Sequence, residues 1–73
     1  MAVERIKSEI TGKVWKIQST PGDRVEEEQI IILIESMKME IPVMAPAAGV
    51  VKEILVKEGD DVAEGQEVAV LEC

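Results

Sequence analysis

The chain of 73 residues contains no histidine, no tyrosine and no phenylalanine, and it has one cysteine and one tryptophan. Without histidine, acid–base catalysis near neutral pH would need a carboxylate or a lysine with a strongly shifted pKa. The lone Cys73 supports neither a disulfide framework nor a zinc site, which needs several Cys or His ligands. We therefore expect no catalytic residue, no metal site and no need for an oxidising compartment.

Basic residues are also scarce, because eight Lys and Arg face fifteen Asp and Glu, which gives a formal net charge of −7. Proteins that bind a phosphate backbone use clustered cations, so we expect no nucleic-acid partner. Residues 1–5 lack the basic and then apolar pattern of a secretory signal. No apolar run approaches the length needed to span a bilayer. We expect no membrane insertion and a cytoplasmic location.

The sequence repeats itself at an interval of 37 residues. An internal repeat indicates one supersecondary unit used twice, here as a single domain of residues 1–73 with a pseudo-two-fold axis. The two halves cover about residues 8–36 and 45–73. The identical positions are Gly12 and Gly49, Val14 and Val51, Ile17 and Ile54, Gly22-Asp23 and Gly59-Asp60, Val25 and Val62, Glu27 and Glu64, Gln29 and Gln66, and Glu35 and Glu72.

The residue patterns predict short strands separated by turns. Residues 30–34 are consecutive β-branched or leucine residues, as in a strand that is covered on both faces and paired along both edges. Pro21-Gly22-Asp23 and Glu58-Gly59-Asp60 are turn sequences at matched positions. We therefore predict an all-β fold, in which two interleaved sets of antiparallel strands close into a flattened barrel or sandwich.

Two local features of the repeat make sharper predictions. Val14 and Ile17 lie three residues apart, as do their mates in the second copy, so strict alternation would place them on opposite faces. A β-bulge in each copy would return both to the core. Glu28 replaces the glycine that stands at position 65 of the other copy, which costs energy if this position needs a positive φ.

Met37-Lys38-Met39 joins the two copies. Glu35-Ser36 ends one predicted strand and Glu40-Ile41 begins the next, so Lys38 is predicted to form the turn of a tight hairpin and to project into solvent. A lysine amine is protonated at neutral pH, so it suits modification by another enzyme better than intrinsic nucleophilic catalysis. The methionines either fill gaps or form an apolar collar around it. The repeat shift places Lys38 on Met1, so the chain ends are expected opposite the hairpin.

Glu35-Ser36-Met37-Lys38-Met39 resembles the Glu-Ala-Met-Lys-Met signature of biotinyl domains in biotin-dependent carboxylases, decarboxylases and transcarboxylases. The resemblance extends from Ile6 to Glu72 and implies the barrel-sandwich hybrid fold of biotinyl and lipoyl domains, with two four-stranded antiparallel sheets. Some members of the family carry an inserted loop called the thumb. The two copies here are evenly spaced and leave no room for that loop, so the chain resembles the thumbless members. The chain departs from the family pattern at Glu9, Glu28 and Ser36, where proline, glycine and alanine are usual.

The resemblance implies that biotin protein ligase attaches biotin to Lys38 with ATP, and that Met37 and Met39 contribute to recognition. It also implies a non-catalytic biotin carboxyl carrier, which shuttles a carboxyl group between biotin carboxylase and a carboxyltransferase or decarboxylase. The carboxyl acceptor is not encoded in this chain.

Two other functions stay open. One is a lipoyl carrier of a 2-oxoacid dehydrogenase complex, with lipoic acid on Lys38, although such domains usually have Asp-Lys-Ala at the tip. The other is an unmodified β-sandwich scaffold or interaction module. Trp15 falls on Lys52 in the repeat, which indicates an outward or edge position, and the sequence favours a tryptophan at the edge of the core over a small contact patch.

Overall fold

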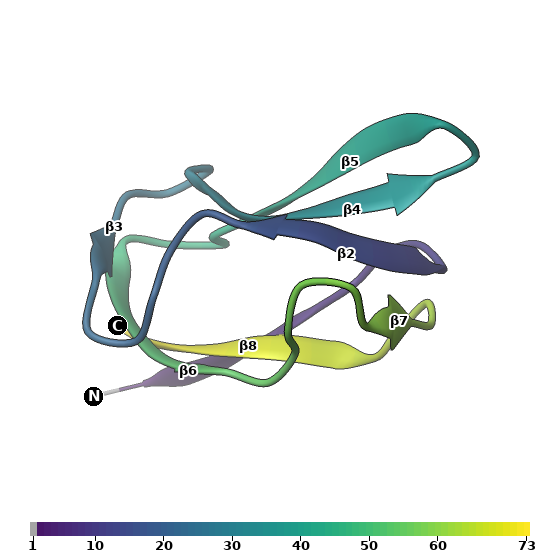
Figure 1. The fold of residues 1–73 in the computed structure, drawn as a ribbon. Coiled ribbons are helices and arrows are strands. Elements are labelled where there is room, and N and C mark those ends of the chain that lie inside the picture. Colours follow the sequence, from purple (N-terminus) through teal and green to yellow (C-terminus); the bar gives the residue numbers. More distant parts are fainter. Residues whose placement is uncertain (1) are drawn as a thin grey trace.

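The computed structural model describes residues 2–73, which form eight β-strands (Figure 1). All paired strands are antiparallel, and they form one four-stranded sheet in the order β1-β8-β6-β3 and another in the order β5-β4-β2-β7. The predicted all-β fold with two four-stranded antiparallel sheets is confirmed. The strands are β1 (Val3–Lys7), β2 (Gly12–Ile17), β3 (Arg24–Val25), β4 (Ile30–Ser36), β5 (Met39–Met44), β6 (Gly49–Ile54), β7 (Asp61–Val62) and β8 (Glu67–Glu72).

The internal repeat relates the two sheets to each other. Strands β1 to β4 correspond to strands β5 to β8, and this exchange turns the strand order of one sheet into that of the other. Each sheet therefore contains two strands from each half, which is the predicted interleaving. The repeat extends beyond residues 8–36 and 45–73 by one strand in each half, because β1 and β5 also correspond, although they share no identical residue at matched positions.

Both predicted bulges are present. The register of β2 against β4 shifts between Val14 and Lys16, and the register of β6 against β8 shifts between Val51 and Glu53. Each bulge is bound by a turn of the other half, because Gly22 N donates to Val51 O at 2.7 Å and Gly59 N donates to Val14 O at 2.8 Å. The halves thus complete each other's backbone hydrogen bonds.

Turns at matched positions use the same chemistry. Asp23 Oδ2 accepts a hydrogen bond from Thr20 N at 2.9 Å, and Asp60 Oδ2 accepts one from Lys57 N at 2.9 Å. Glu28 has a φ of 69° where its mate Gly65 has 86°. The positive φ that made glutamate unfavourable there is therefore real.

The hydrophobic core lies between the sheets and consists mainly of Val and Ile. As predicted, β4 is paired along both edges, with β5 and β2. The prediction that both its faces are covered is wrong, since Ile30 is exposed and Leu33 is only half-buried. It is the mate strand β8 whose residues Val68 to Leu71 are all buried.

The molecule is elongated, with extents of 36 × 17 × 17 Å. The hairpin that joins β4 to β5 lies at one end, and both chain ends lie at the other (Figure 1). There Cys73 N donates to Ala2 O at 2.9 Å. Met1, onto which the repeat places Lys38, is outside the described residues. No helix long and apolar enough to cross a membrane occurs in residues 2–73.

Candidate functional site

The hairpin between β4 and β5 has a two-residue turn made of Met37 and Lys38. Ser36 pairs with Met39, so β5 begins at Met39 and not at Glu40 as the sequence suggested. The φ angles of Met37 and Lys38 are 52° and 65°. Positive φ at both central residues is the geometry of a type I′ turn, whose twist matches that of the flanking strands.

This turn is made from residues that do not favour it. Type I′ turns prefer Asn-Gly, because a side chain without a local hydrogen-bonding group is destabilised at positive φ by about 1 kcal/mol or more. Met37 and Lys38 both have a positive φ, and neither side chain has such a group. Unfavourable residues held at a turn indicate that their side chains serve a purpose other than stabilising the fold.

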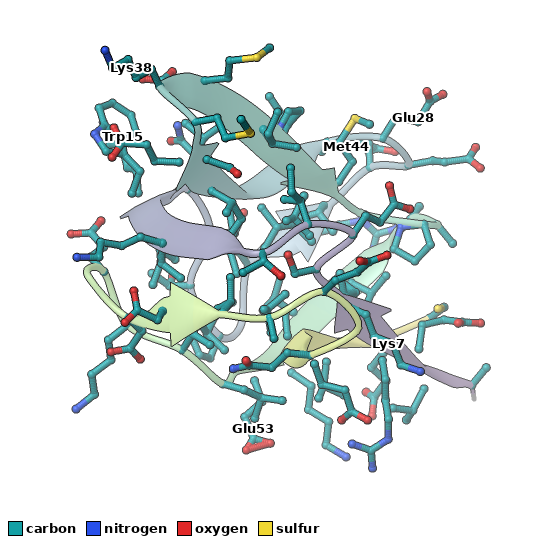
Figure 2. The ribbon with its side chains drawn as sticks, turned by 90° about the vertical axis from the view of Figure 1, so that its right-hand side faces the viewer. Lys7, Trp15, Glu28, Lys38, Met44 and Glu53 are labelled. Atoms are coloured by element: carbon teal, nitrogen blue, oxygen red, sulfur yellow. The ribbon has the colours of Figure 1, made fainter. Side chains whose placement is uncertain are left out.

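Lys38 lies at the tip and is exposed, as predicted. Figure 2 shows its side chain directed away from the strands. Within residues 2–73 the one ion pair joins Arg5 and Glu67 at 3.0 Å, so the Lys38 amine has no acidic partner there. The amine can therefore reach another protein without first breaking an internal contact.

The two methionines beside Lys38 are also exposed. Met37 is 92 % exposed and Met39 is 62 % exposed. These values exclude a role in filling gaps in the core. They fit the other interpretation, in which flexible thioether side chains form an apolar surface around the amine.

The base of the hairpin is fixed to β2. Ser36 Oγ donates to Thr11 O at 3.0 Å. A Cβ placed on Gly12 would lie 2.5 Å from Glu35 O, so only glycine lets the two strands approach this closely. The sequence did not assign these contacts to the site, although the pairing of Gly12 with Gly49 in the repeat was a signal for them.

Charged side chains lie across the sheet next to the turn. Glu35 of β4 pairs with Glu40 of β5 on one side and with Lys13 of β2 on the other. Opposed like charges destabilise a sheet, and Lys13 offsets part of that effect. This row of one cation and two carboxylates carries one net negative charge.

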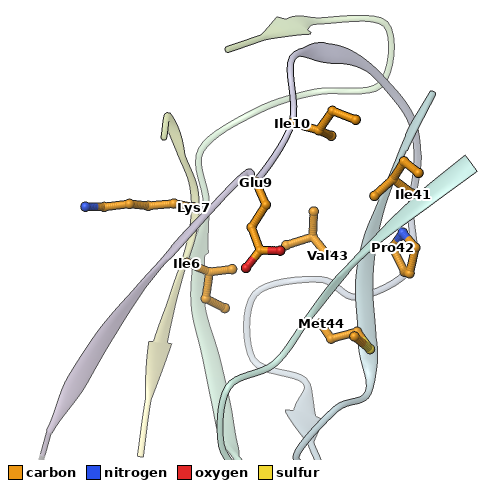
Figure 3. A pocket seen from close by; sticks show the side chains of 8 residues that line it. All are labelled: Ile6, Lys7, Glu9, Ile10, Ile41, Pro42, Val43 and Met44. Atoms are coloured by element: carbon orange, nitrogen blue, oxygen red, sulfur yellow. The ribbon is translucent and has the colours of Figure 1, made fainter. Parts of the chain in front are cut away.

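A small cavity of about 130 Å³ lies away from the turn residues, next to a larger and more open hollow that shares Ile6, Lys7, Glu9 and Met44 with it. The small cavity lies where edge strand β1 of one sheet faces edge strand β5 of the other, and its lining includes the repeat mates Ile6 and Val43. Figure 3 shows Glu9 directed into it and Lys7 directed away. No group of three or more His, Cys, Asp or Glu is placed to hold a metal ion within residues 2–73. The cavity brings together no nucleophile and base.

Comparison with known proteins points to a single family. Residues 3–71 match the biotin/lipoyl family model, described as "Biotin-requiring enzyme". The chain is 45 % identical over 60 residues to the biotin/lipoyl attachment protein of Bacillus subtilis, covering 82 % of each chain. It is 38 % identical over 68 residues to a homologue of biotinylated protein TB7.3 from Mycobacterium leprae, covering 93 % of this chain and 96 % of the relative.

Solved structures of a carboxylase and of a lipoyl domain have the same fold. Kluyveromyces lactis urea carboxylase matches 99 % of this chain with a TM-score of 0.93 and 43 % identity, over 6 % of its own length. The lipoyl domain of the Azotobacter vinelandii 2-oxoglutarate dehydrogenase complex matches 99 % of this chain and 98 % of its own, with a TM-score of 0.78 and 30 % identity.

Proposed function

Since the chain belongs to the biotin/lipoyl attachment family and is a biotin/lipoyl carrier domain, we propose that it carries biotin, joined through an amide bond to Nζ of Lys38. The observation that supports this most is the lone exposed lysine at a two-residue turn, set between two exposed methionines. Within residues 2–73 no other lysine has a positive φ.

Biotin is favoured over lipoic acid by the residues that flank Lys38. Met37 and Met39 match the biotinyl signature, whereas lipoyl domains usually have Asp and Ala beside the lysine. The Mycobacterium leprae relative, which is named as a homologue of a biotinylated protein and is matched over 96 % of its length, supports the same choice. Lipoylation is the second candidate, because a lipoyl domain shares the fold over nearly its whole length.

In the proposed loading step, biotin protein ligase first joins biotin to ATP, with release of pyrophosphate. Lys38 Nζ then gives up a proton and attacks the activated acyl carbon, so that the amide bond forms and AMP leaves. The ligase supplies the base for that proton, because no acidic side chain in the described part of the chain pairs with the amine. Exposure of Lys38 and rigid attachment of the hairpin to β2 let the amine enter the ligase site.

Attached biotin would offer a ureido nitrogen that accepts a carboxyl group. The protein makes no bond itself in this scheme and is a carrier, not an enzyme. We propose biotin carboxylase and a carboxyltransferase or decarboxylase as its partners, with the cytoplasm as its location. Tethering raises the effective concentration of the cofactor at both partner sites without new contacts.

Loading in vitro tests the proposal. The unmodified chain is incubated with ATP and biotin plus biotin protein ligase, or with ATP and lipoate plus lipoate ligase, and its intact mass is measured. We expect the mass of one biotinyl group in the first reaction, none in Lys38→Arg, and full loading in the control Lys52→Arg. Loading with lipoate alone would support the second candidate, and no loading in either reaction would support an unmodified scaffold.

A further inference from the structure

Trp15 is the single aromatic residue of the chain, and it is 47 % exposed. It lies in β2, which is an inner strand of its sheet, between β4 and β7. The repeat mate of Trp15 is Lys52, which occupies the equivalent bulge of β6. The bulge therefore folds with a lysine as well as with an indole, and the fold alone does not require tryptophan here.

The strand register places Trp15 beside the strand that leads to Lys38. Trp15 lies between Val14, which pairs with Ile34, and Lys16, which pairs with Leu33. Strand β4 continues two residues beyond Ile34 to Ser36, or about 7 Å, before the two-residue turn that contains Lys38, and the neighbouring strand adds about 4.8 Å sideways. In Figure 2 the side chains of Trp15 and Lys38 lie at the same corner of the molecule and point to the same side.

Two apolar residues and the exposed Lys16 lie on the outer face next to Trp15. Leu33, which is half-buried, pairs with Lys16 on one side and with Pro42 of β5 on the other. Ile32 and Ile34 are buried in the core, so Leu33 between them belongs to the outer face, together with Lys16, which pairs with it. Trp15, Leu33 and Pro42 together form what we call the Trp15 surface.

A cofactor arm on Lys38 is long enough to reach this surface. The lysine side chain and the valeryl chain of biotin supply ten single bonds, or about 12 Å of reach before the ring system begins. The indole extends from its own backbone toward solvent and shortens the remaining gap. Between the turn and the Trp15 surface lies the Glu35 and Lys13 pair, which the flexible chain can cross.

On this geometry we propose that the Trp15 surface is a resting site for the biotin ring system attached to Lys38, an inference that rests on the proposed function. The sulfur-containing ring and the flat ureido group would lie against the indole, since thioethers and flat groups pack favourably on aromatic faces. Because the indole is half exposed, the contact is weak. The population with biotin on the Trp15 surface and the population with biotin in solvent therefore differ by only about a few-fold. Partner enzymes can therefore bind the attached biotin without displacing a strong contact.

The composition of the chain makes this proposal directly measurable. With one tryptophan and no tyrosine, the intrinsic fluorescence reports on Trp15 alone. Emission spectra and acrylamide quenching are recorded for the unmodified and the biotinylated chain, with loading verified by intact mass. We expect biotinylation to move the emission to shorter wavelength and to lower the quenching constant. We also expect nuclear Overhauser contacts between indole protons and biotin ring protons.

The internal repeat provides a matched control. The double variant Trp15→Lys with Lys52→Trp moves the indole into the equivalent bulge of β6, in the sheet that does not contain the hairpin. Lys38 is unchanged, so this variant should load fully while its fluorescence stays the same on loading. If the double variant does not fold, the nuclear Overhauser contacts in the natural sequence decide alone.

The outcomes separate this inference from the proposed function. A full mass gain with unchanged Trp15 emission and no indole contact to biotin overturns the resting site and leaves the carrier function standing. An equal spectral change in the swapped variant also overturns the resting site. Absence of any biotinyl mass gain overturns both.

Discussion

Among residues 2–73, three residues other than glycine have a positive φ, and they divide into two kinds. Met37 and Lys38 form the turn of the candidate site, whereas Glu28 lies in a surface turn whose mate in the repeat is Gly65. Side-chain identity matters at the first two positions if an enzyme has to recognise them. Nothing in the structure explains glutamate at position 28. A substitution there can therefore relieve the backbone strain of its positive φ.

Glu28→Gly is predicted to stabilise the protein by about 0.5–1 kcal/mol, because glycine adopts a φ of 69° without the clash of a Cβ atom. Urea unfolding measures the change in the free energy of unfolding. Gly65→Ala, the reverse type of change in the other half, should lose about 1 kcal/mol. A Glu28→Gly variant that is no more stable than the natural sequence would contradict this account.

Met37→Asn is predicted to stabilise the turn by about 0.5 kcal/mol, since asparagine tolerates a positive φ better than methionine does. The same change should slow loading by biotin protein ligase, because it removes an exposed thioether beside the amine. Time courses of biotinyl mass gain measure this rate. The control is Met44→Asn, which changes an exposed methionine of β5 away from the turn. Equal loading rates in all three proteins would show that Met37 is not recognised.

At the scale of the element, the hairpin depends on the close approach of β2 to β4. Gly12 permits that approach because it has no Cβ atom; a Cβ there would overlap Glu35 O. Gly49 does the same for β6 and β8, where a Cβ would overlap Glu72 O. The two glycines are repeat mates, but only Gly12 lies beside the hairpin that carries Lys38.

Gly12→Ala and Gly49→Ala are therefore each predicted to destabilise the protein, by about 2 kcal/mol, since backbone must move to admit the methyl group. Their effects on loading should differ. Gly12→Ala shifts the base of the hairpin and should slow biotin attachment, whereas Gly49→Ala should not. Urea unfolding and the loading time course measure the two quantities. Loss of loading in Gly49→Ala alone would contradict the assignment of the site.

The elements predicted best from the sequence are those whose signal occurs twice. Both bulges and the turns at Gly22 and Gly59 were predictable, because matched spacing in two copies excludes chance. Strand β5 was harder to predict, since it shares no identical residue with β1 and contains Pro42. The proline is tolerated because β5 is an edge strand. The two-residue turn could not be predicted, because Met37 carries no type I′ preference.

The candidate site was predictable in the same uneven way. An exposed Lys38 followed from its place between two strands. The contacts of Ser36 with Thr11 and of Gly12 with Glu35 join residues more than twenty positions apart, and no local pattern encodes such approaches. The exposure of Ile30 within an apolar run also depends on the bulge that faces β5.

At the scale of the whole molecule, neither half is a separate folding unit. Each sheet takes strands from both halves, and each half donates backbone hydrogen bonds to the bulge of the other. The core is shared between the sheets. This arrangement predicts one cooperative unfolding transition for the whole chain.

Asp23→Ala and Asp60→Ala test that symmetry. Each removes a carboxylate that accepts a turn hydrogen bond at 2.9 Å, so each should destabilise the protein by about 1 kcal/mol. The two losses should add in the double variant, because the two turns share no hydrogen-bond partner. Chemical denaturation followed by circular dichroism and by Trp15 fluorescence should give coincident transitions. Separate transitions from the two probes would contradict the shared core.

The carrier assignment is tested most directly by the intact mass of this protein purified from the cells that make it, with the modified residue located by peptide fragmentation. The account predicts the mass of one biotinyl group, located on Lys38. A lipoyl mass on Lys38, a biotinyl group on another lysine, or a chain without any addition in cells that make biotin enzymes would contradict it.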